Sequence, residues 1–168
     1  MNTRQLQCAL DSDPAMKDYS RNVFALDQFQ RVNLSDKGIF ECNDQPLKKS
    51  GNYWFLIFID PEKIYFVDSF ANEPKYYHVD EKLRTLKKPI FTFSKMLQSP
   101  FSTLCGEYCI FFAYHLSRNF NLEYVIRFFT NDCVQNDQNV KDFIWRKFPG
   151  HERDSCLLYT SPSPRDRG

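Results

Sequence analysis

The segment from residue 105 to residue 118, CGEYCIFFAYHLSR, is apolar on nearly every side when it is wound into a helix. A surface helix carries its apolar residues along one stripe, so a helix that is apolar all round has to be enclosed by other elements. The longest uninterrupted apolar stretches, 53–59 and 109–114, are far shorter than the roughly 20 residues of a membrane span. The sequence therefore predicts a helix in the centre of a folded core.

Strands that can cover this helix come earlier in the chain. Trp54–Ile59 (WFLIFI) is a continuous apolar run, which is typical of a strand buried on both faces. A turn containing Asp60 and Pro61 separates it from a second strand at 64–68 (IYFVD), so the two are expected to form a central antiparallel hairpin. We also predict short strands at 38–42 and 89–93.

Helices are predicted on both sides of the hairpin in the sequence, and they are short. They span residues 3–10, capped by Asn2 or Thr3, and residues 80–88, 122–130 and 139–148. Residues 23–30 show no sustained period. The order helix, strands, core helix, helices predicts an α+β fold in which a mixed central β-sheet packs against the helix that begins at Cys105.

Length and composition fit one domain inside a cell. The chain has 168 residues, and its 22 Lys and Arg nearly balance its 21 Asp and Glu, so no broad basic surface indicates nucleic acid as the main ligand. Six cysteines are too few for a disulfide scaffold, and residues 1–10 lack the pattern of a signal peptide. We expect a protein of the cytoplasm or nucleus.

The C-terminal segment differs from the rest of the chain. Residues 156–166, CLLYTSPSPRD, resemble the translation of a transposase adapter used to prepare sequencing libraries. A natural tail rich in Ser, Pro and Arg would be disordered on composition alone. In either case we expect a single domain over residues 1–154 and a disordered segment over residues 155–168.

Three polar residues occupy positions at which they could act together. Cys105 opens the core helix, where the helix dipole and unpaired N–H groups favour a thiolate, although a buried cysteine more often only packs. Gln98, seven residues earlier, could act with the Cys105 N–H as an oxyanion donor, or it could be a solvated loop residue. Asp68 ends a strand beside the one that Tyr53 and Trp54 open, so it could orient a group there or cap its own loop.

These segments resemble the adenain-like cysteine peptidases, the adenovirus-type proteases also encoded by large self-synthesising DNA transposons and related viruses, and more distantly the SUMO-specific proteases. That family combines Gly-x-His-Trp, (Phe/Val)-Asp-Ser-(Phe/Tyr)-Gly and Gln-x6-Cys-Gly segments. Trp54, Asp68-Ser69-Phe70, Gln98 and Cys105-Gly106 match in the same order. The resemblance implies that Cys105 is the nucleophile, that Gln98 is an oxyanion donor and that Asp68 orients the base. It also implies that Trp54 shapes the substrate cleft, unless Trp54 is only core.

Two positions depart from the family pattern. Tyr53 stands where the family has its catalytic histidine, and Ala71 stands where glycine is usual. A phenol, with a pKa near 10, cannot accept a proton near neutral pH as an imidazole does. We expect His78, His115 and His151 to be surface or internally bonded residues rather than replacement bases.

The resemblance implies a cysteine endopeptidase that processes viral or transposon structural proteins, in the cell or in a virion. Tyr53 leaves three explanations: an inactive protease fold kept as a binding module, a sequence error in a histidine codon, or an enzyme with a different base. An isopeptidase for ubiquitin-like modifiers is a further alternative.

The partner is expected to be a protein or peptide substrate, while DNA and an activating peptide are implied by the resemblance alone. We expect a monomer that does not bind membranes.

The sequence contains no motif typical of a metal site or of a redox-active cysteine pair. Cys42, His78 and Cys133 lack the paired spacing of a zinc site. Cys105 and Cys109 are four residues apart rather than in a Cys-x-x-Cys motif. We therefore predict no metal and no cofactor.

Overall fold

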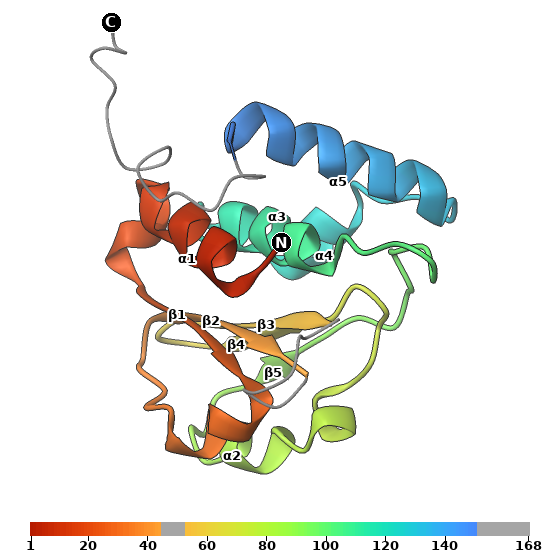
Figure 1. The fold of residues 1–168 in the computed structure, drawn as a ribbon. Helices are drawn as coiled ribbons and strands as arrows, with labels where there is room; N and C mark the ends of the chain where they lie inside the picture. The colour runs from red at the N-terminus through yellow and green to blue at the C-terminus, as the bar shows by residue number, and fades with distance from the viewer. Residues whose placement is uncertain (45–52, 151–168) are drawn as a thin grey trace, which may run out of the picture.

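A mixed sheet of five strands, in the order β1-β2-β3-β4-β5, forms the middle of the protein (Figure 1). The computed structural model describes residues 1–44 and 53–150. The strands are β1 (Ser20–Ala25), β2 (Gly38–Asn43), β3 (Trp54–Ile59), β4 (Ile64–Val67) and β5 (Ile90–Phe91). The two outer pairs, β1 with β2 and β4 with β5, are parallel, whereas the inner pairs are antiparallel. The predicted α+β class, the mixed sheet and the central hairpin are confirmed.

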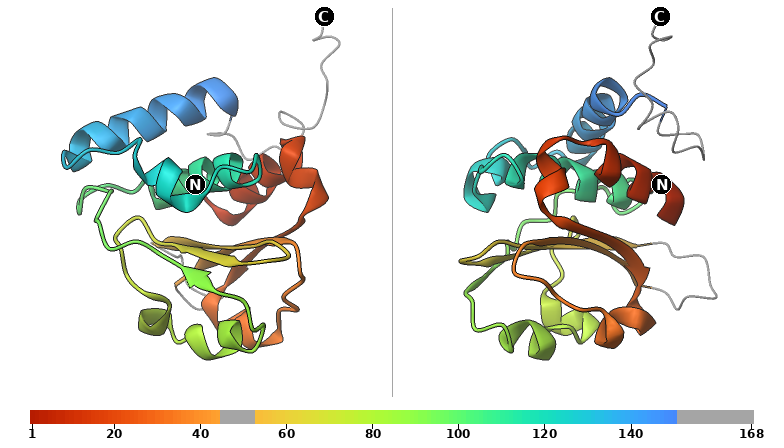
Figure 2. Two further views of the ribbon diagram at one scale, coloured as in Figure 1. Left: turned by 180° about the vertical axis from the view of Figure 1, so that it is seen from behind. Right: turned by 90° about the vertical axis from the view of Figure 1, so that its left-hand side faces the viewer.

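Helices lie on both faces of this sheet (Figures 1 and 2). One face is covered by α1 (Thr3–Ser12), α3 (Cys105–Leu116), α4 (Leu122–Ile126) and α5 (Cys133–Lys147). The other face carries α2 (Asp80–Arg84) and the short 3-10 helices η2 (Leu26–Arg31) and η3 (Pro74–Tyr77). A third 3-10 helix, η1 (Ala15–Asp18), connects α1 to β1. Each face of the sheet has its own hydrophobic core, and β3 contributes to both because alternate residues of a strand point to opposite faces. The core under α3 contains Trp54, Leu56 and Phe58, and the core under α2 contains Phe55, Ile57 and Ile59.

The core helix predicted from residue 105 is α3, and all of its residues except Tyr114 are buried. Its C-terminal end is tied to the start of the chain, because the Arg118 guanidinium donates to both carboxylate oxygens of Asp13 at 2.8 and 3.0 Å. At its N-terminal end, the Trp54 indole donates to the Met1 carbonyl at 3.2 Å. These bonds hold the helix between α1 and the sheet.

Several predicted boundaries were wrong, and one strand was missed. Residues 23–30 contain the end of β1, an edge strand in which only Phe24 and Ala25 are buried, so its sequence shows no alternation. The helix predicted at 122–130 ends at Ile126, and the one predicted at 139–148 begins at Cys133, after an Asp132 cap. The helix predicted at 80–88 and the strand predicted at 89–93 shrink to α2 and β5. Asn2 caps α1, as predicted.

Some predictions concern residues that the structure does not describe. His151 and the segment 155–168 lie outside the described residues, so the domain limit at 154 remains a prediction. Within the described residues, no helix is long and apolar enough to cross a membrane.

Candidate active site

Cys105 is the first residue of α3 and lies directly against the start of β3. Its side chain is 3% exposed and belongs to the same buried cluster as Trp54, the first residue of β3. The nucleophile candidate therefore lies at the start of β3. Position 53, where the resembled peptidases have their histidine, directly precedes Trp54 in the chain.

Gly106 explains how α3 comes this close to its neighbours. A Cβ atom at this position would lie 3.3 Å from side-chain atoms of both Leu6 and Met1, and 3.5 Å from the Trp54 ring. A larger residue would require the Leu6 and Met1 side chains to shift, whereas 3.5 Å to the Trp54 ring is an ordinary contact. Gly106 thus lets the start of α3 lie close to the first residues of the chain.

The Cys105 thiol is protonated in this environment. Burial raises the pKa of Cys105 to about 11, although the hydrogen bonds from the Trp54 and Gly106 N–H groups act in the opposite direction. The position at the helix N-terminus does not overcome this desolvation. A neighbouring base is needed to form the thiolate at neutral pH.

Tyr53 immediately precedes β3 and is 43% exposed. Its ring packs edge-on against Phe70, with 5.3 Å between the ring centroids. Its backbone is fixed by Asp44, whose N–H donates to the Tyr53 carbonyl at 3.1 Å and whose carboxylate accepts from the Tyr53 N–H at 3.3 Å. Within residues 1–44 and 53–150, no hydrogen bond joins the Tyr53 hydroxyl to Asp68. The residue at the base position is therefore held in place without the predicted carboxylate partner.

Asp68 follows β4 and is buried, with both carboxylate oxygens in use. Oδ2 accepts from the Tyr77 hydroxyl at 2.5 Å, and Oδ1 accepts from the Phe70 N–H at 2.8 Å. Burial raises the pKa of Asp68, while the hydrogen bonds from Tyr77 and Phe70 lower it. Burial also raises the pKa of Tyr77, as does the nearby Asp68 carboxylate, so Tyr77 remains a donor. Asp68 caps its own loop, which was the alternative to orienting a group on β3.

Gln98 is fully buried, so the alternative of a solvated loop residue is wrong. Its Oε1 accepts from the Ser69 hydroxyl at 2.5 Å, and its Nε2 donates to the carbonyl and the hydroxyl of Ser102 at 3.0 and 2.9 Å. The backbone N–H groups of Leu97 and Gln98 both donate to the Ser69 carbonyl. The amide is thus fixed between the loop that follows β4 and the turn that precedes α3. To bind an oxyanion, Nε2 has to exchange a bond with Ser102.

Trp54 belongs to the core rather than to an open surface. It is 5% exposed, and its ring lies in the cluster that α3 covers. This burial agrees with the packing alternative, and a contact with substrate stays a prediction. Tyr77 and Ser102, which hold predicted site residues in place, were missed, and Ser69 was named only as part of a matching segment, because nothing in the sequence marks which polar side chains pair.

The two described histidines lie away from Cys105 or are already bonded. His78 is exposed and ends η3 in a left-handed conformation, with a φ of 59°. His115 is buried near the other end of α3, with Nδ1 2.8 Å from the Phe111 carbonyl oxygen, and burial lowers its pKa. Both described histidines therefore agree with the prediction that each is a surface or an internally bonded residue. Among the described residues, no group of three His, Cys, Asp or Glu side chains is arranged to hold a metal ion.

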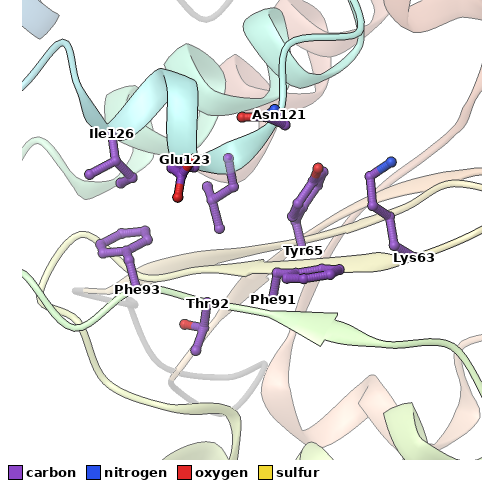
Figure 3. A pocket seen from close by; sticks show the side chains of 9 residues that line it. Lys63, Tyr65, Phe91, Thr92, Phe93, Asn121, Glu123 and Ile126 are labelled. Carbon is purple, nitrogen blue, oxygen red and sulfur yellow. The ribbon is translucent and has the colours of Figure 1, made fainter.

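A separate cavity lies beside α4, which follows the C-terminal end of α3 (Figure 3). It has a volume of about 540 Å³ and is lined by aromatic residues of β4 and β5, Tyr65 and Phe91, together with Lys63, Asn121 and Ile126. None of the predicted site residues lines it. The candidate active site and this cavity are therefore different places on the molecule.

Comparisons with known proteins support the fold. No protein-family model and no curated protein sequence matches the chain. Among solved structures, ChlaDub1 from Chlamydia trachomatis is similar with a TM-score of 0.57 and 11% identity, over 92% of this chain and 80% of that one. The ASFV pS273R protease is similar with a TM-score of 0.53 and 16% identity, over 88% of this chain and 66% of that one. The chain thus has the α+β fold of the adenain and SUMO-protease-like cysteine peptidases.

Proposed function

We propose that this chain is a cysteine peptidase of the adenain type that acts on a structural protein of a virus or DNA transposon, and that Tyr53 deprives it of an effective base. The packing of the start of α3 against Trp54 carries the proposal, because Cys105 and Trp54 share one buried cluster and position 53 directly precedes Trp54 in the chain. We expect a histidine at this position to reach the thiol. The chain with Tyr53 is expected to bind a polypeptide and to cleave it slowly or not at all.

The chemistry requires a thiolate, an oxyanion site and a proton donor. The Cys105 thiolate would attack a peptide carbonyl carbon, and the resulting oxyanion would accept hydrogen bonds from the Cys105 N–H and from Gln98 Nε2. The C–N bond would then break as the leaving amine takes a proton from the group at position 53, and water would hydrolyse the resulting Cys105 thioester to release the second product and restore the thiol. Tyr53 can donate a proton, but it cannot take one from the thiol at neutral pH, so the first step is the one that fails.

Restoring the histidine tests this proposal. The chain itself, Tyr53→His and Tyr53→His/Cys105→Ala are compared on internally quenched peptides made from candidate structural proteins. We expect Tyr53→His to raise kcat/KM by about 10²- to 10⁴-fold, the usual contribution of a general base, and the double variant to be inactive. Full activity in the unchanged chain would contradict the missing base. No gain in Tyr53→His would contradict the assignment of position 53.

An isopeptidase for ubiquitin-like modifiers is the second candidate, favoured by the resemblance of the motifs at 68–70 and 98–106 to the SUMO-specific proteases. The same variants are given ubiquitin-like proteins whose C-terminal diglycine is linked to a fluorophore. Cleavage of these substrates by Tyr53→His, without cleavage of internal peptide sites, would favour the isopeptidase over the endopeptidase.

A further inference from the structure

Phe101 is an aromatic residue that the fold leaves almost entirely uncovered, four residues before Cys105. Its side chain is 95% exposed, more than any other large apolar side chain in the described residues. Exposed single apolar residues are common on proteins and need no explanation by themselves. Phe101 differs in standing four residues before the nucleophile candidate, which points to a role in binding.

The turn that carries Phe101 is held by hydrogen bonds on several sides. The Ser102 N–H donates to the Ser99 carbonyl at 3.0 Å, which closes a β-turn with Pro100 and Phe101 as its central residues. The Ser102 hydroxyl accepts from the Leu104 N–H at 3.1 Å and from Gln98 Nε2 at 2.9 Å. These bonds fix the turn to the residue proposed as an oxyanion donor and to the residue before the core helix.

A further bond ties this turn to the helices behind it. The Ser99 N–H donates to a carboxylate oxygen of Asp137 on α5 at 3.3 Å, and the same oxygen accepts from the Tyr108 hydroxyl of α3 at 2.8 Å. Phe101 thus projects from a turn whose backbone is held by hydrogen bonds. A side chain held in this way loses little further backbone freedom when a ligand covers it.

The short chain segment between Phe101 and Cys105 limits how far Phe101 can lie from the nucleophile candidate. Four residues of chain span at most about 14 Å, so the Phe101 backbone lies within that distance of Cys105. A substrate in extended conformation advances about 3.3 Å per residue. A polypeptide that has its scissile bond at Cys105 and extends towards this turn would bring a side chain near Phe101 within about four residues of that bond. Trp54 is buried and offers little surface for such a contact, whereas Phe101 is exposed.

We propose that Phe101 is a specificity-determining residue that contacts an apolar or aromatic side chain of the polypeptide bound across Cys105. This inference rests on the proposed function, because it assumes that a polypeptide reaches the Cys105 thiol. It does not require turnover. Binding to a chain that lacks a base is sufficient.

The test uses alkylation of Cys105, which needs no general base when the pH is high. Epoxysuccinyl peptides that extend in both directions from the epoxide are made with Phe or Ser at each of the four nearest positions on either side. Alkylation rates of Cys105 at pH 9.5 are measured by mass spectrometry for the unchanged chain, Phe101→Ser and the control Trp145→Ser. Trp145 is 48% exposed on α5, so its removal also deletes an exposed aromatic.

The unchanged chain is expected to prefer Phe over Ser at one position by about 10- to 100-fold, the range that burial of one phenyl group gives. Phe101→Ser should reduce this preference to less than about threefold, while Trp145→Ser should retain it. The melting temperature of Phe101→Ser should stay unchanged, because the side chain makes so few contacts.

The possible outcomes separate this inference from the proposed function. An unchanged preference in Phe101→Ser, or no aromatic preference at any position in the unchanged chain, would overturn the role of Phe101. Selective alkylation that depends on Phe101, together with no turnover by Tyr53→His, would support the inference and contradict the proposed catalysis. No alkylation of Cys105 by any probe would overturn both.

Discussion

Replacing Tyr53 by histidine is expected to change how the reactivity of Cys105 depends on pH. The thiol of the unchanged chain has a pKa of about 11 because it is buried, an effect that nearby backbone N–H groups and the N-terminal charge only partly offset. An imidazole at position 53 could take the thiol proton and remain beside the thiolate as a cation. Such thiolate–imidazolium pairs have thiol pKa values of roughly 3.5 to 7.5.

The size of the change follows from two opposing effects. At pH 7.5, a thiol with a pKa of about 11 is roughly 0.03% ionised, so a fall to about 6 raises the thiolate fraction about 3,000-fold. Each thiolate also becomes less nucleophilic, by about 100- to 300-fold for a pKa change of about 5 and a Brønsted coefficient of 0.4 to 0.5. The net gain in alkylation rate at pH 7.5 is therefore only about 10- to 30-fold.

The shape of the pH profile is a clearer measurement than this rate. Iodoacetamide alkylation of Cys105 is followed by peptide mass spectrometry from pH 5 to pH 10, with the partly exposed free Cys133 in the same sample as the internal control. The unchanged chain should react about tenfold faster per pH unit up to pH 10, while Tyr53→His should level off above about pH 7. A plateau below pH 9 in the unchanged chain would refute the burial argument. Identical profiles would refute the placement of position 53 beside Cys105.

Three further predictions concern stability. Ala71 has a φ of 64°, a left-handed conformation that disfavours residues with a Cβ atom, so Ala71→Gly should raise the free energy of unfolding by about 0.5 to 1 kcal/mol in urea denaturation; a loss would contradict this. Ser102→Ala should lower it by about 1 to 2 kcal/mol, because the Leu104 N–H and Gln98 Nε2 each lose an acceptor, and no loss would mean that the turn is not held by this hydroxyl. Glu41 is fully buried on β2, and neither of its carboxyl oxygens has a hydrogen-bond partner among the described residues; burial raises its pKa well above the usual range. Between about pH 4.3 and the raised folded-state pKa, the unfolded chain ionises Glu41 while the folded chain keeps it protonated, so the free energy of unfolding falls as the pH rises. The stability advantage of Glu41→Met should therefore grow between pH 5 and pH 8 by up to about 1.4 kcal/mol per unit, and a constant difference would refute it.

The strongly apolar elements could be predicted because an element that is buried on all sides has apolar residues at nearly every position. Trp54–Ile59 is apolar at every position because both of its faces are covered, and α3 is apolar all round for the same reason. β1 shows no such pattern, since only two of its six residues are buried at the edge of the sheet. Its parallel pairing with β2 depends on contacts that a local pattern does not contain.

The sequence indicated which residues form the candidate site, but it did not indicate the hydrogen bonds that hold them. The spacing from Gln98 to Cys105 and the order of the segments indicated which residues gather, while the burial of Gln98 and its bonds to Ser69 and Ser102 depend on tertiary structure. The same holds for Asp68, whose partner Tyr77 is nine residues away in a 3-10 helix. The exposure of Phe101 could not be predicted, because the local sequence does not show which side of a loop the rest of the fold covers.

The bonds that hold α3 in place also bear on when the site forms during folding. Arg118 reaches back 105 residues to Asp13, Trp54 reaches back 53 residues to Met1, and Ser69 pairs with Gln98 across 29 residues. Contacts between residues so far apart in sequence close large loops, and proteins dominated by them fold more slowly than helical bundles. A growing chain on the ribosome has no complete site until α3 and the Arg118 that follows it have emerged. The nucleophile and its partners therefore assemble late, at a stage when most of the sheet has already been synthesised.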